Sequence, residues 1–503
     1  MNLTQKTIKA GMWQLTSMAI RFVVQLVVIA ILARRILPSA FGLIALANMA
    51  LVFTEMFAEA GIGPAIIQKK DLRQEHIRAG FTLAVILGTF FVVILWMAAP
   101  LLAVLFKSET LEDIIRWLSL SVLVIKFGMI SRSLIEREIR FDKLMWTDAG
   151  SYVFGYAPVG IAMAIMGYGV WSIVAAKLVQ CCLQSIVLFA WQPHSVKPVF
   201  STRAYKEIGI YGGGLTLARL FDNTASQGDV FIIGRFCSVT LLGIYERASS
   251  IMAMPGQYLG YLLDKILFPS MSQIQDQPKR LEGAYLKAIN IVNVTLFPLS
   301  VLMFVVAPEL ITVLLGPRWT DAVIPLRILL VTLNLRICIN LSDTLVRATG
   351  AVYSSAARKA VFAFLVIFGS WVGQRWGIAG VAIAVSLAVI INYSLMTQLS
   401  IKLINCSLNN YLGRLKDGYV VGGVLFLISF FCVSVLRLCT DSALLTLVIT
   451  GVCSCLLSGI AVFLFFPGVL NSSVFELLPQ LVDEKYRKHP FFCRLSEFRK
   501  NNL

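Results

Sequence analysis

The chain has 503 residues, of which 58% are hydrophobic and only 14% are charged, and its mean hydropathy is +0.80. Soluble domains usually contain about 25% charged residues, so the composition excludes an ordinary soluble protein and predicts a polytopic membrane protein. The formal net charge is +17. Because the basic residues of membrane proteins concentrate in cytoplasmic loops, this charge does not require a nucleic-acid partner, and none is expected.

Hydropathy predicts an all-α fold with about fourteen transmembrane helices. In the first half of the chain the expected spans are 12–36, 41–66, 80–106, 114–135, 146–166 and 169–191. In the second half they are 208–235, 238–263, 285–306, 322–347, 356–374 and 377–401, followed by two further spans at 418–437 and 442–467. The span 114–135 is the weakest of these, because Arg116 and Lys126 interrupt it.

The basic residues are distributed unevenly between the two sides of the predicted membrane. With the N-terminus in the cytoplasm, roughly twenty-nine Lys and Arg fall in tails and loops on that side and roughly eight on the other. This asymmetry predicts an even number of spans and two cytoplasmic termini. The apolar run 11–36 is too long for the core of a signal peptide, so we expect a retained helix.

The two halves of the chain share an ordered set of short motifs. The pattern A-R-x7-G-x4-A at 33–47 recurs as G-R-x7-G-x4-A at 234–248. Three more pairs follow in the same order, with offsets from 201 to 208 residues: 64–71 with 269–276, 99–102 with 307–310, and 169–173 with 377–381. This order predicts two copies of six spans each. An even number of spans makes the copies parallel, a plan typical of transporters with a central path.

The predicted domains follow from this repeat. They are an N-terminal six-helix bundle at 1–195, a cytoplasmic linker at 196–207, a C-terminal six-helix bundle at 208–403, two additional transmembrane helices at 404–470 and a cytoplasmic tail at 471–503. The two bundles are expected to surround a central cavity.

Charged residues inside the predicted spans indicate where that cavity lies. In the seventh span, Arg219, Asp222 and Asp229 share one helical face, and charge within a membrane normally faces protein or water. The repeat aligns Arg21 with Asp222, and Gln25 shares a face with Arg21. The expected substrate path is lined by Arg21, Gln25, Lys126, Arg219, Asp222, Asp229 and Arg336.

The lining as a whole has a basic excess, which favours an anionic substrate, and arginine is suited to bidentate contact with phosphate. Other interpretations remain open: Lys177 and Arg327 can reach water from helix ends, and Arg219 and Asp222 can form a structural ion pair. Buried carboxylates can also carry a proton through a transport cycle. The candidates for ion or proton coupling are Glu55, Glu59, Asp222 and Asp229, although Glu55 and Glu59 can simply be solvated at a cytoplasmic helix end.

No pattern in the sequence predicts an enzyme. His76, His194 and His489 lie far apart in predicted loops, and the ten cysteines form no C-x-x-C pair. We therefore expect no metal site, no cofactor and no catalytic residue.

Several motifs resemble the Wzx and WzxC polysaccharide flippases of the multidrug, oligosaccharidyl-lipid and polysaccharide (MOP) exporter superfamily. They are L-A-R-R-I-L-P-S-A-F-G-L (32–43), I-I-Q-K-K-D (66–71), D-V-F-I-I-G-R (229–235), L-G-I-Y-E-R-A (242–248), L-F-P-S-M-S-Q-I-Q-D (267–276) and G-P-R-W-T-D-A-V-I-P-L-R-I-L (316–329). The resemblance extends from the first span to about residue 400. The segment I-E-R-E-I-R-F (135–141) and the pair Glu246-Arg247 depart from the family pattern, which leaves the roles of these loops open.

The resemblance implies an inner-membrane flippase that works by alternating access. Its substrate would be an undecaprenyl-pyrophosphate-linked oligosaccharide, moved to the periplasmic leaflet for exopolysaccharide, capsule or O-antigen (lipopolysaccharide) synthesis. It also implies membrane lipid and the polysaccharide polymerase or export machinery as partners. The alternatives are a cation-coupled multidrug or metabolite exporter and a peptidoglycan-precursor lipid flippase of the same superfamily. A membrane glycosyltransferase or polymerase is disfavoured because the sequence has no D-x-D motif and no long loop.

Overall fold

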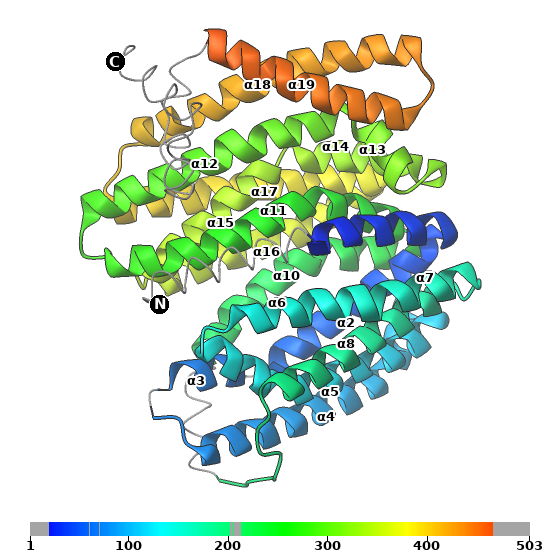
Figure 1. Ribbon diagram of the computed structural model, residues 1–503, viewed down its shortest axis with the longest axis vertical. Helices are drawn as coiled ribbons and strands as arrows, with labels where there is room; N and C mark the ends of the chain where they lie inside the picture. Colours follow the sequence, from blue (N-terminus) through cyan, green and yellow to red (C-terminus); the bar gives the residue numbers. More distant parts are fainter. Residues whose placement is uncertain (1–19, 60, 70, 202–204, 206–212, 466–503) are drawn as a thin grey trace. The chain divides into compact units, whose positions relative to one another are not determined.

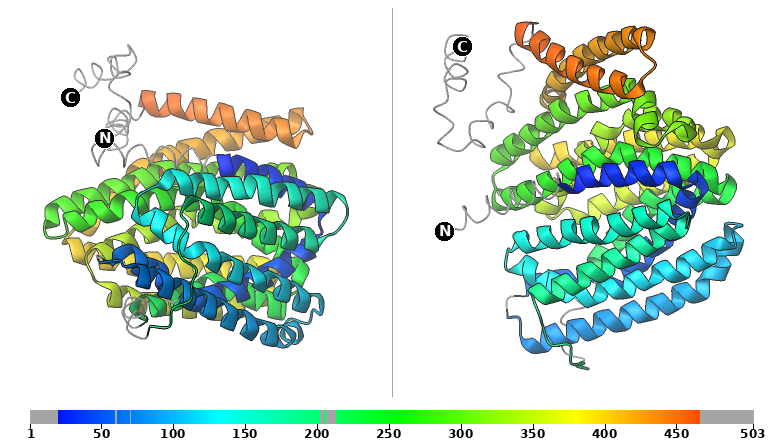
Figure 2. Two further views of the ribbon diagram at one scale, coloured as in Figure 1. Left: turned by 60° about the horizontal axis from the view of Figure 1, so that its bottom comes forward. Right: turned by 45° about the vertical axis from the view of Figure 1, so that its right-hand side comes forward.

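The computed structural model describes residues 20–59, 61–69, 71–201, 205 and 213–465 (Figures 1 and 2). Every regular element within these ranges is a helix, so the all-α prediction is confirmed. Eight of the described helices are long and apolar enough to cross a membrane, and a ninth candidate is a bent pair of shorter helices. The protein is therefore a multi-pass membrane protein, while the total of fourteen spans stays a prediction.

The contacts between Cα atoms group the chain into two compact units. The first unit comprises Met1–Arg247, Leu314–Ala322 and Lys359–Val385, and the second comprises Ala248–Val313, Val323–Arg358 and Ser386–Leu503. The two units are discontinuous in sequence and do not test the predicted bundle boundaries, which remain a prediction.

The first unit contains most of the helices expected for the N-terminal bundle. After a helix at residues 20–35 come α2 (Pro38–Glu59), α3 (Ile62–Gln68), α4 (Gln74–Leu105), α5 (Thr110–Arg137), α6 (Phe141–Gly150), the π-helix η1 (Ser151–Tyr156), α7 (Ala157–Ile165), α8 (Val170–Trp191) and α10 (Gly213–Phe236). The 3₁₀ helices η2 (Pro317–Ala322) and η3 (Gln374–Trp376) also belong to it. Helix α5 packs against α2, α4 and α8, so it forms the centre of this group.

The second expected span, 41–66, is broken in the structure. Helix α2 ends at Glu59, and α3 begins at Ile62 after Gly61, whose φ of 71° lies in the left-handed region that glycine adopts at no steric cost. Arg137 of α5 stabilises the end of α3, because its Nη1 donates to the carbonyls of Ile66 and Lys69 at 2.9 and 2.6 Å. The hydropathy of the segment continues through the break, so hydropathy alone did not predict it.

The second unit contains α12 (Pro278–Val305), α13 (Ala307–Leu314), α14 (Val323–Leu330), α15 (Leu333–Ala348), α18 (Leu408–Cys439) and α19 (Ala443–Phe465). Helices α11 (Val239–Gln273), α16 (Val352–Gly373) and α17 (Gly377–Ile404) contribute residues to both units. The expected span 322–347 consists of α14 and α15, which are bent by 47° relative to each other. Between α12, α15 and α18, the buried core includes Tyr285, Leu341 and Tyr411.

Helix α18 lies directly against α12. A Cβ atom on Gly418 would stand 2.3 Å from the side chain of Asn293, and one on Gly422 would stand 2.4 Å from Phe297. Asn293 also donates a hydrogen bond to the carbonyl of Leu415. Small residues commonly permit such close approach between membrane helices. Helix α19 packs in turn on α18.

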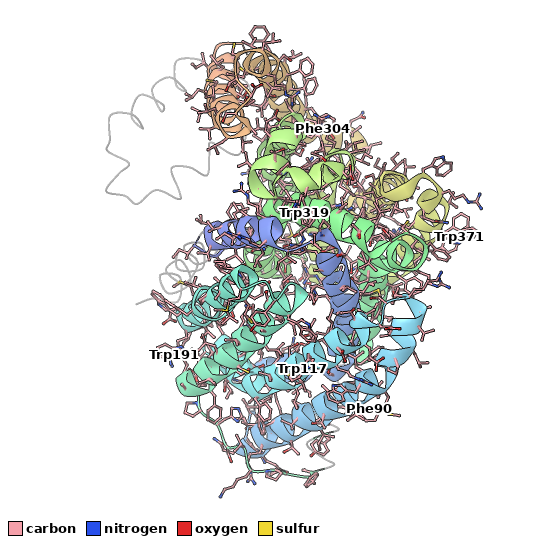
Figure 3. All side chains as sticks on the ribbon, turned by 90° about the vertical axis from the view of Figure 1, so that its right-hand side faces the viewer. Phe90, Trp117, Trp191, Phe304, Trp319 and Trp371 are labelled. Atoms are coloured by element: carbon pink, nitrogen blue, oxygen red, sulfur yellow. The ribbon has the colours of Figure 1, made fainter. Side chains whose placement is uncertain are left out.

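Large apolar side chains project outward from several helices (Figure 3). Phe90 of α4, Trp117 of α5 and Trp371 of α16 are 55%, 53% and 44% exposed. Trp319 of η2, in contrast, is fully buried in the first unit. The exposed apolar surface is what a membrane protein presents to lipid chains, which lack the polar partners that water offers.

Candidate transport site: a polar pocket and charged helix faces

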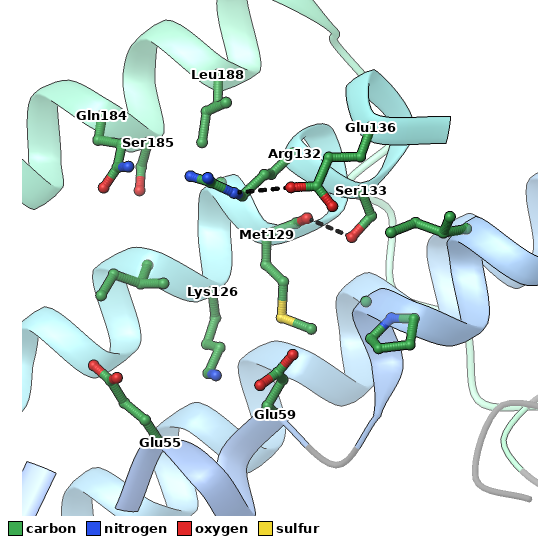
Figure 4. A pocket seen from close by; sticks show the side chains of 15 residues that line it. Glu55, Glu59, Lys126, Met129, Arg132, Ser133, Glu136, Gln184, Ser185 and Leu188 are labelled. Atoms are coloured by element: carbon green, nitrogen blue, oxygen red, sulfur yellow. Dashed lines mark hydrogen bonds and ion pairs between the residues drawn. The ribbon is translucent and has the colours of Figure 1, made fainter. Parts of the chain in front are cut away.

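A cavity of about 410 Å³ lies within the first unit (Figure 4). It is bounded by the end of α2, by α3, by the second half of α5 and by α8. Its charged lining consists of three carboxylates and two cations, namely Glu55, Glu59, Glu136, Lys126 and Arg132. This pocket therefore brings together three of the residues that the sequence predicted: Glu55, Glu59 and Lys126.

Lys126 is the central cation of the pocket. Its side chain is only 3% exposed, and its ammonium group points into the space between the carboxylates of Glu55 and Glu59 (Figure 4). The two glutamates are four residues apart on α2, so they lie on the same helix face. Lys177 of α8 adds a second positive charge that acts on Glu55. A buried cation is thus matched by carboxylates from a neighbouring helix, as the cost of burying charge requires.

Two glycines make room for this arrangement. A Cβ atom on Gly88 of α4 would stand 2.9 Å from Cγ of Lys126. The aliphatic part of the lysine side chain therefore packs against α4 at a glycine. A Cβ atom on Gly63 of α3 would stand 3.3 Å from Oγ of Ser133. The close approach of α3 and α4 to α5 therefore depends on residues without side chains.

Arg132 is held in a separate ion-pair network. Its two Nη atoms donate to the carboxylate of Asp148 on α6 at 3.0 and 3.1 Å, and its Nε lies 3.4 Å from Oε1 of Glu136. Gln184 of α8 donates to the same Asp148 carboxylate at 2.8 Å. The bidentate geometry fixes the guanidinium group in space and ties α5, α6 and α8 together.

Arg21 and Gln25 lie on the helix at 20–35 and are both half-buried. The guanidinium carbon of Arg21 stands 5.7 Å from the ring centroid of Tyr152, which is stacked on Tyr156 at a centroid distance of 5.0 Å. The tyrosines belong to η1, the π-helical turn of the expected span 146–166. The Nε atom of Arg21 is buried and forms no hydrogen bond.

The two aspartates of α10 have different partners. Asp222 is paired with Lys359 of α16, with 2.7 Å between Oδ2 and Nζ. Asp229 is buried and accepts a hydrogen bond of 2.7 Å from the hydroxyl of Tyr245. The side chain of Arg219 lies outside the described residues, so its predicted pairing with Asp222 stays a prediction.

Arg336 belongs to the second unit, on α15, where its Nε lies 3.5 Å from Oγ1 of Thr332. The sequence reasoning missed a stronger group in the same unit. Asp264 of α11 accepts from Thr344 at 2.6 Å and pairs with Arg347, both on α15. The charges of Asp264 and Arg347 lie near predicted helix ends, where solvated residues are common, and the sequence contains no signal that pairs them.

The basic loops gather at the end of the first unit where α3 lies. Residues 192–200, called the strap below, follow α8 and run across this end. Arg78 donates to the carbonyl of Lys197 at 3.2 Å, and Ser131 donates to the carbonyl of Gln192 at 2.9 Å. His194 packs edge-on against Phe81 and Phe189. The strap is therefore a fixed part of the first unit.

Burial lowers the pKa of His194 from its ordinary value of 6.5, so the imidazole is neutral in the folded strap at neutral pH. Since the unfolded side chain binds a proton more readily, the stabilisation of the strap is complete above pH 6.5 and is lost as the pH falls below that value. We expect faster cleavage of the strap by a protease at pH 5 than at pH 7.5, measured under conditions where the protease is equally active. A His194→Phe variant should lose this difference; an unchanged pH dependence in the variant would contradict the assignment.

Residues 31–324 match the model of the polysaccharide biosynthesis protein family. This match covers more than half of the chain, and the protein belongs to that family. It is 24% identical over 413 residues to the lipopolysaccharide biosynthesis protein WzxC of Escherichia coli, which covers 80% of this chain and 82% of the relative. It is 22% identical over 437 residues to the teichuronic acid biosynthesis protein TuaB of Bacillus subtilis, with 85% and 89% covered.

The fold is shared with solved structures of membrane transporters. The lipid II flippase MurJ in an inward closed conformation superimposes with a TM-score of 0.74 at 14% identity, over 92% of this chain and 100% of that one. An inward-facing multidrug resistance MATE family transporter of the MOP superfamily gives 0.62 at 16% identity, over 79% and 99%. These likenesses show that the chain has a fold found in membrane transporters of that superfamily.

Proposed function

We propose that this protein is an inner-membrane flippase for undecaprenyl-pyrophosphate-linked oligosaccharide repeat units. It moves them from the cytoplasmic to the periplasmic leaflet by alternating access, for exopolysaccharide, capsule or O-antigen synthesis. The observation that carries the proposal is the family match over 31–324 on a fold shared with a lipid flippase. A cytoplasmic location of the end of the first unit with α3 is supported by the basic residues there, because basic residues concentrate in cytoplasmic loops.

The predicted contact with an anionic substrate is supported by Arg21. Its guanidinium group is half-buried, and its Nε has no hydrogen-bond partner, so donors remain for a phosphate oxygen. Arg247 of α11 resembles it, because its buried Nε is also without a hydrogen bond. Both residues belong to the first unit.

The pocket supports a separate role in ion or proton coupling. Its lining carries three carboxylates against two cations, so it favours a cation over an anionic head group. A proton or cation that binds Glu55 or Glu59 competes with Lys126 for the same carboxylates. A ligand drives a conformational change only through different affinities for two states, and release of Lys126 would provide such a difference.

The structural comparison favours a lipid-linked substrate over a drug. The MATE transporter covers 79% of this chain, whereas MurJ, whose name describes a lipid II flippase, covers 92%. A peptidoglycan-precursor flippase is therefore the second candidate. The curated relatives, whose names refer to lipopolysaccharide and teichuronic acid biosynthesis, favour a polysaccharide precursor instead.

Deletion of the gene in its host, followed by lipid extraction, tests the proposal. We expect undecaprenyl-pyrophosphate-linked oligosaccharide to accumulate on the cytoplasmic leaflet, because synthesis continues while translocation stops. Mass spectrometry of the sugar released by mild acid would identify the repeat unit. Accumulated lipid II would support the second candidate, whereas no accumulation of any lipid-linked sugar and unchanged polysaccharide would refute both. The wild-type gene on a plasmid should clear the lipid.

A further inference from the structure

Three aromatic rings and one guanidinium group form a continuous row along α16 and η3. The rings of Phe364 and Phe368 are stacked at a centroid distance of 5.7 Å, and the ring of Phe368 lies 6.0 Å from that of Trp371. The guanidinium carbon of Arg375 stands 5.9 Å from the Trp371 centroid. Because these residues are three or four positions apart, they share one helical face. The row of these four side chains is called the aromatic ladder below.

The aromatic ladder faces outward from the first unit. Phe364 and Phe368 are 63% and 50% exposed, and Figure 3 shows Trp371 projecting from α16. A different face of α16 packs on α10, since a Cβ atom on Gly228 would stand 3.0 Å from Cγ1 of Ile367. The exposed rings are therefore available to hydrocarbon chains, which contact them by dispersion and require no polar partner.

A tight hairpin fixes the charged end of the aromatic ladder. The turn η3 joins α16 to α17, and Gly377 at the start of α17 has a φ of 69°, in the left-handed region that glycine adopts readily. A Cβ atom on Gly373 would stand 2.5 Å from the carbonyl oxygen of Gly380, so the two backbones are in contact beside the turn. Arg375 is consequently held at the end of a helix pair and not on a long loop.

The charge of Arg375 is not balanced by a neighbouring acid. The sequence contains no Asp or Glu between Asp343 and Asp417, and none of the carboxylates in the described ranges forms an ion pair with this arginine. Trp371 and Trp376 lie on either side of it and are 44% and 70% exposed, and tryptophan concentrates at the level of the lipid head groups. A guanidinium group in this setting is complementary to a lipid phosphate, to which it can donate two parallel hydrogen bonds.

We propose that the aromatic ladder is a binding site for an anionic phospholipid, whose phosphate contacts Arg375 while one acyl chain lies along the rings. From Phe364 to Arg375 a helix rises about 16 Å, which is close to the hydrocarbon depth of one leaflet. A row one side chain wide fits a single hydrocarbon chain better than a protein partner, whose stable interfaces bury at least about 1,000 Å². On the predicted topology the lipid belongs to the extracytoplasmic leaflet, where the chain has few other cations.

Native mass spectrometry of the purified full-length protein, titrated with phosphatidylglycerol or phosphatidylcholine, tests the site. We expect one phosphatidylglycerol to bind at least about fivefold more tightly than phosphatidylcholine, the preference that one arginine near a phosphate provides. Arg375→Gln should remove this preference, and Trp371→Leu should weaken the binding of both lipids. Lys107→Gln is the matched control, because Lys107 is an exposed cation on the same predicted side of the membrane and lies outside the aromatic ladder.

The outcomes separate the occupants. All the substituted side chains are at least partly exposed, so circular dichroism and thermal unfolding should show folded variants. An unchanged preference for phosphatidylglycerol in folded Arg375→Gln would overturn the proposal. Undecaprenyl pyrophosphate that displaces phosphatidylglycerol from the native chain, but not from Arg375→Gln, would overturn the assignment to a phospholipid. None of these measurements depends on transport, so the proposed flippase function is tested separately.

A photoactivatable phosphatidylglycerol with a diazirine in its acyl chain locates the bound chain. After illumination in nanodiscs, the peptide that contains Phe364 and Phe368 should carry several-fold more label than the peptide around Phe90, which is similarly exposed on α4. The enrichment should disappear in Arg375→Gln. Equal labelling of the two peptides in the native chain would show that the aromatic ladder is ordinary lipid-facing surface and would contradict the proposal.

Discussion

Replacement of Trp319 by alanine is expected to destabilise the first unit by about 3–5 kcal/mol, the range observed when a large buried aromatic side chain is removed. Trp319 is fully buried, its Nε1 donates to the carbonyl of Ala33 at 3.0 Å, and its ring meets Phe41 edge-on. The residue belongs to η2, far along the chain from the helix that it supports. Its loss would therefore remove a long-range contact between the end of the helix at 20–35, α2 and η2.

Unfolding of the purified protein in detergent, followed as a function of denaturant, would measure this effect. Trp319→Phe should cost less, about 1–3 kcal/mol, because it keeps most of the ring but leaves the Ala33 carbonyl without its donor. Trp376→Ala is the matched control, since Trp376 is 70% exposed and should change stability by no more than about 0.5 kcal/mol. Equal effects for Trp319 and Trp376 would contradict the packing described here.

Replacement of Lys126 by methionine is expected to lower export at least about tenfold and to destabilise the protein. The change leaves Glu55 and Glu59 without the cation that lies between them, and removal of one partner from a buried pair typically costs about 3–5 kcal/mol. Methionine keeps the length of the apolar stem that passes Gly88, so the packing is otherwise preserved.

The double variant Lys126→Met with Glu55→Gln separates stability from transport. We expect it to regain part of the lost stability, because one unpaired charge has been removed, but not to regain export. Lys107→Met is the control, as Lys107 is an exposed lysine in the turn after α4. Normal export by Lys126→Met would exclude the pocket from the transport cycle.

The composition and hydropathy predicted the all-α membrane fold well, because long apolar segments in a bilayer can satisfy their backbone only as helices. Even the weakest span, 114–135, forms the continuous helix α5. The charge of Lys126 is accommodated there by Glu55, Glu59 and Gly88, which are distant in sequence. Hydropathy measures each segment alone, so it underestimated a span whose charge is balanced by another helix.

The breaks within spans were not predicted for a related reason. The bend between α14 and α15 and the left-handed Gly61 interrupt segments whose apolar character continues. The sequence also did not predict which residues pair with the charged residues. The pair Asp222–Lys359 joins residues 137 positions apart, and Asp229 is satisfied by Tyr245, whose hydroxyl carries no sequence signal of that role. Identifying these partners requires the tertiary structure.

The close packing of α18 on α12 determines how α18 and α19, the last two helices of the described residues, can move. Because Gly418 and Gly422 lie directly against Asn293 and Phe297, while α19 packs on α18, a displacement of α12 would move α18 and α19 with it. A fluorophore attached near Cys439, the last residue of α18, would then report the movement of α12. The rotation of α12 could be followed in working protein without a label on α12 itself.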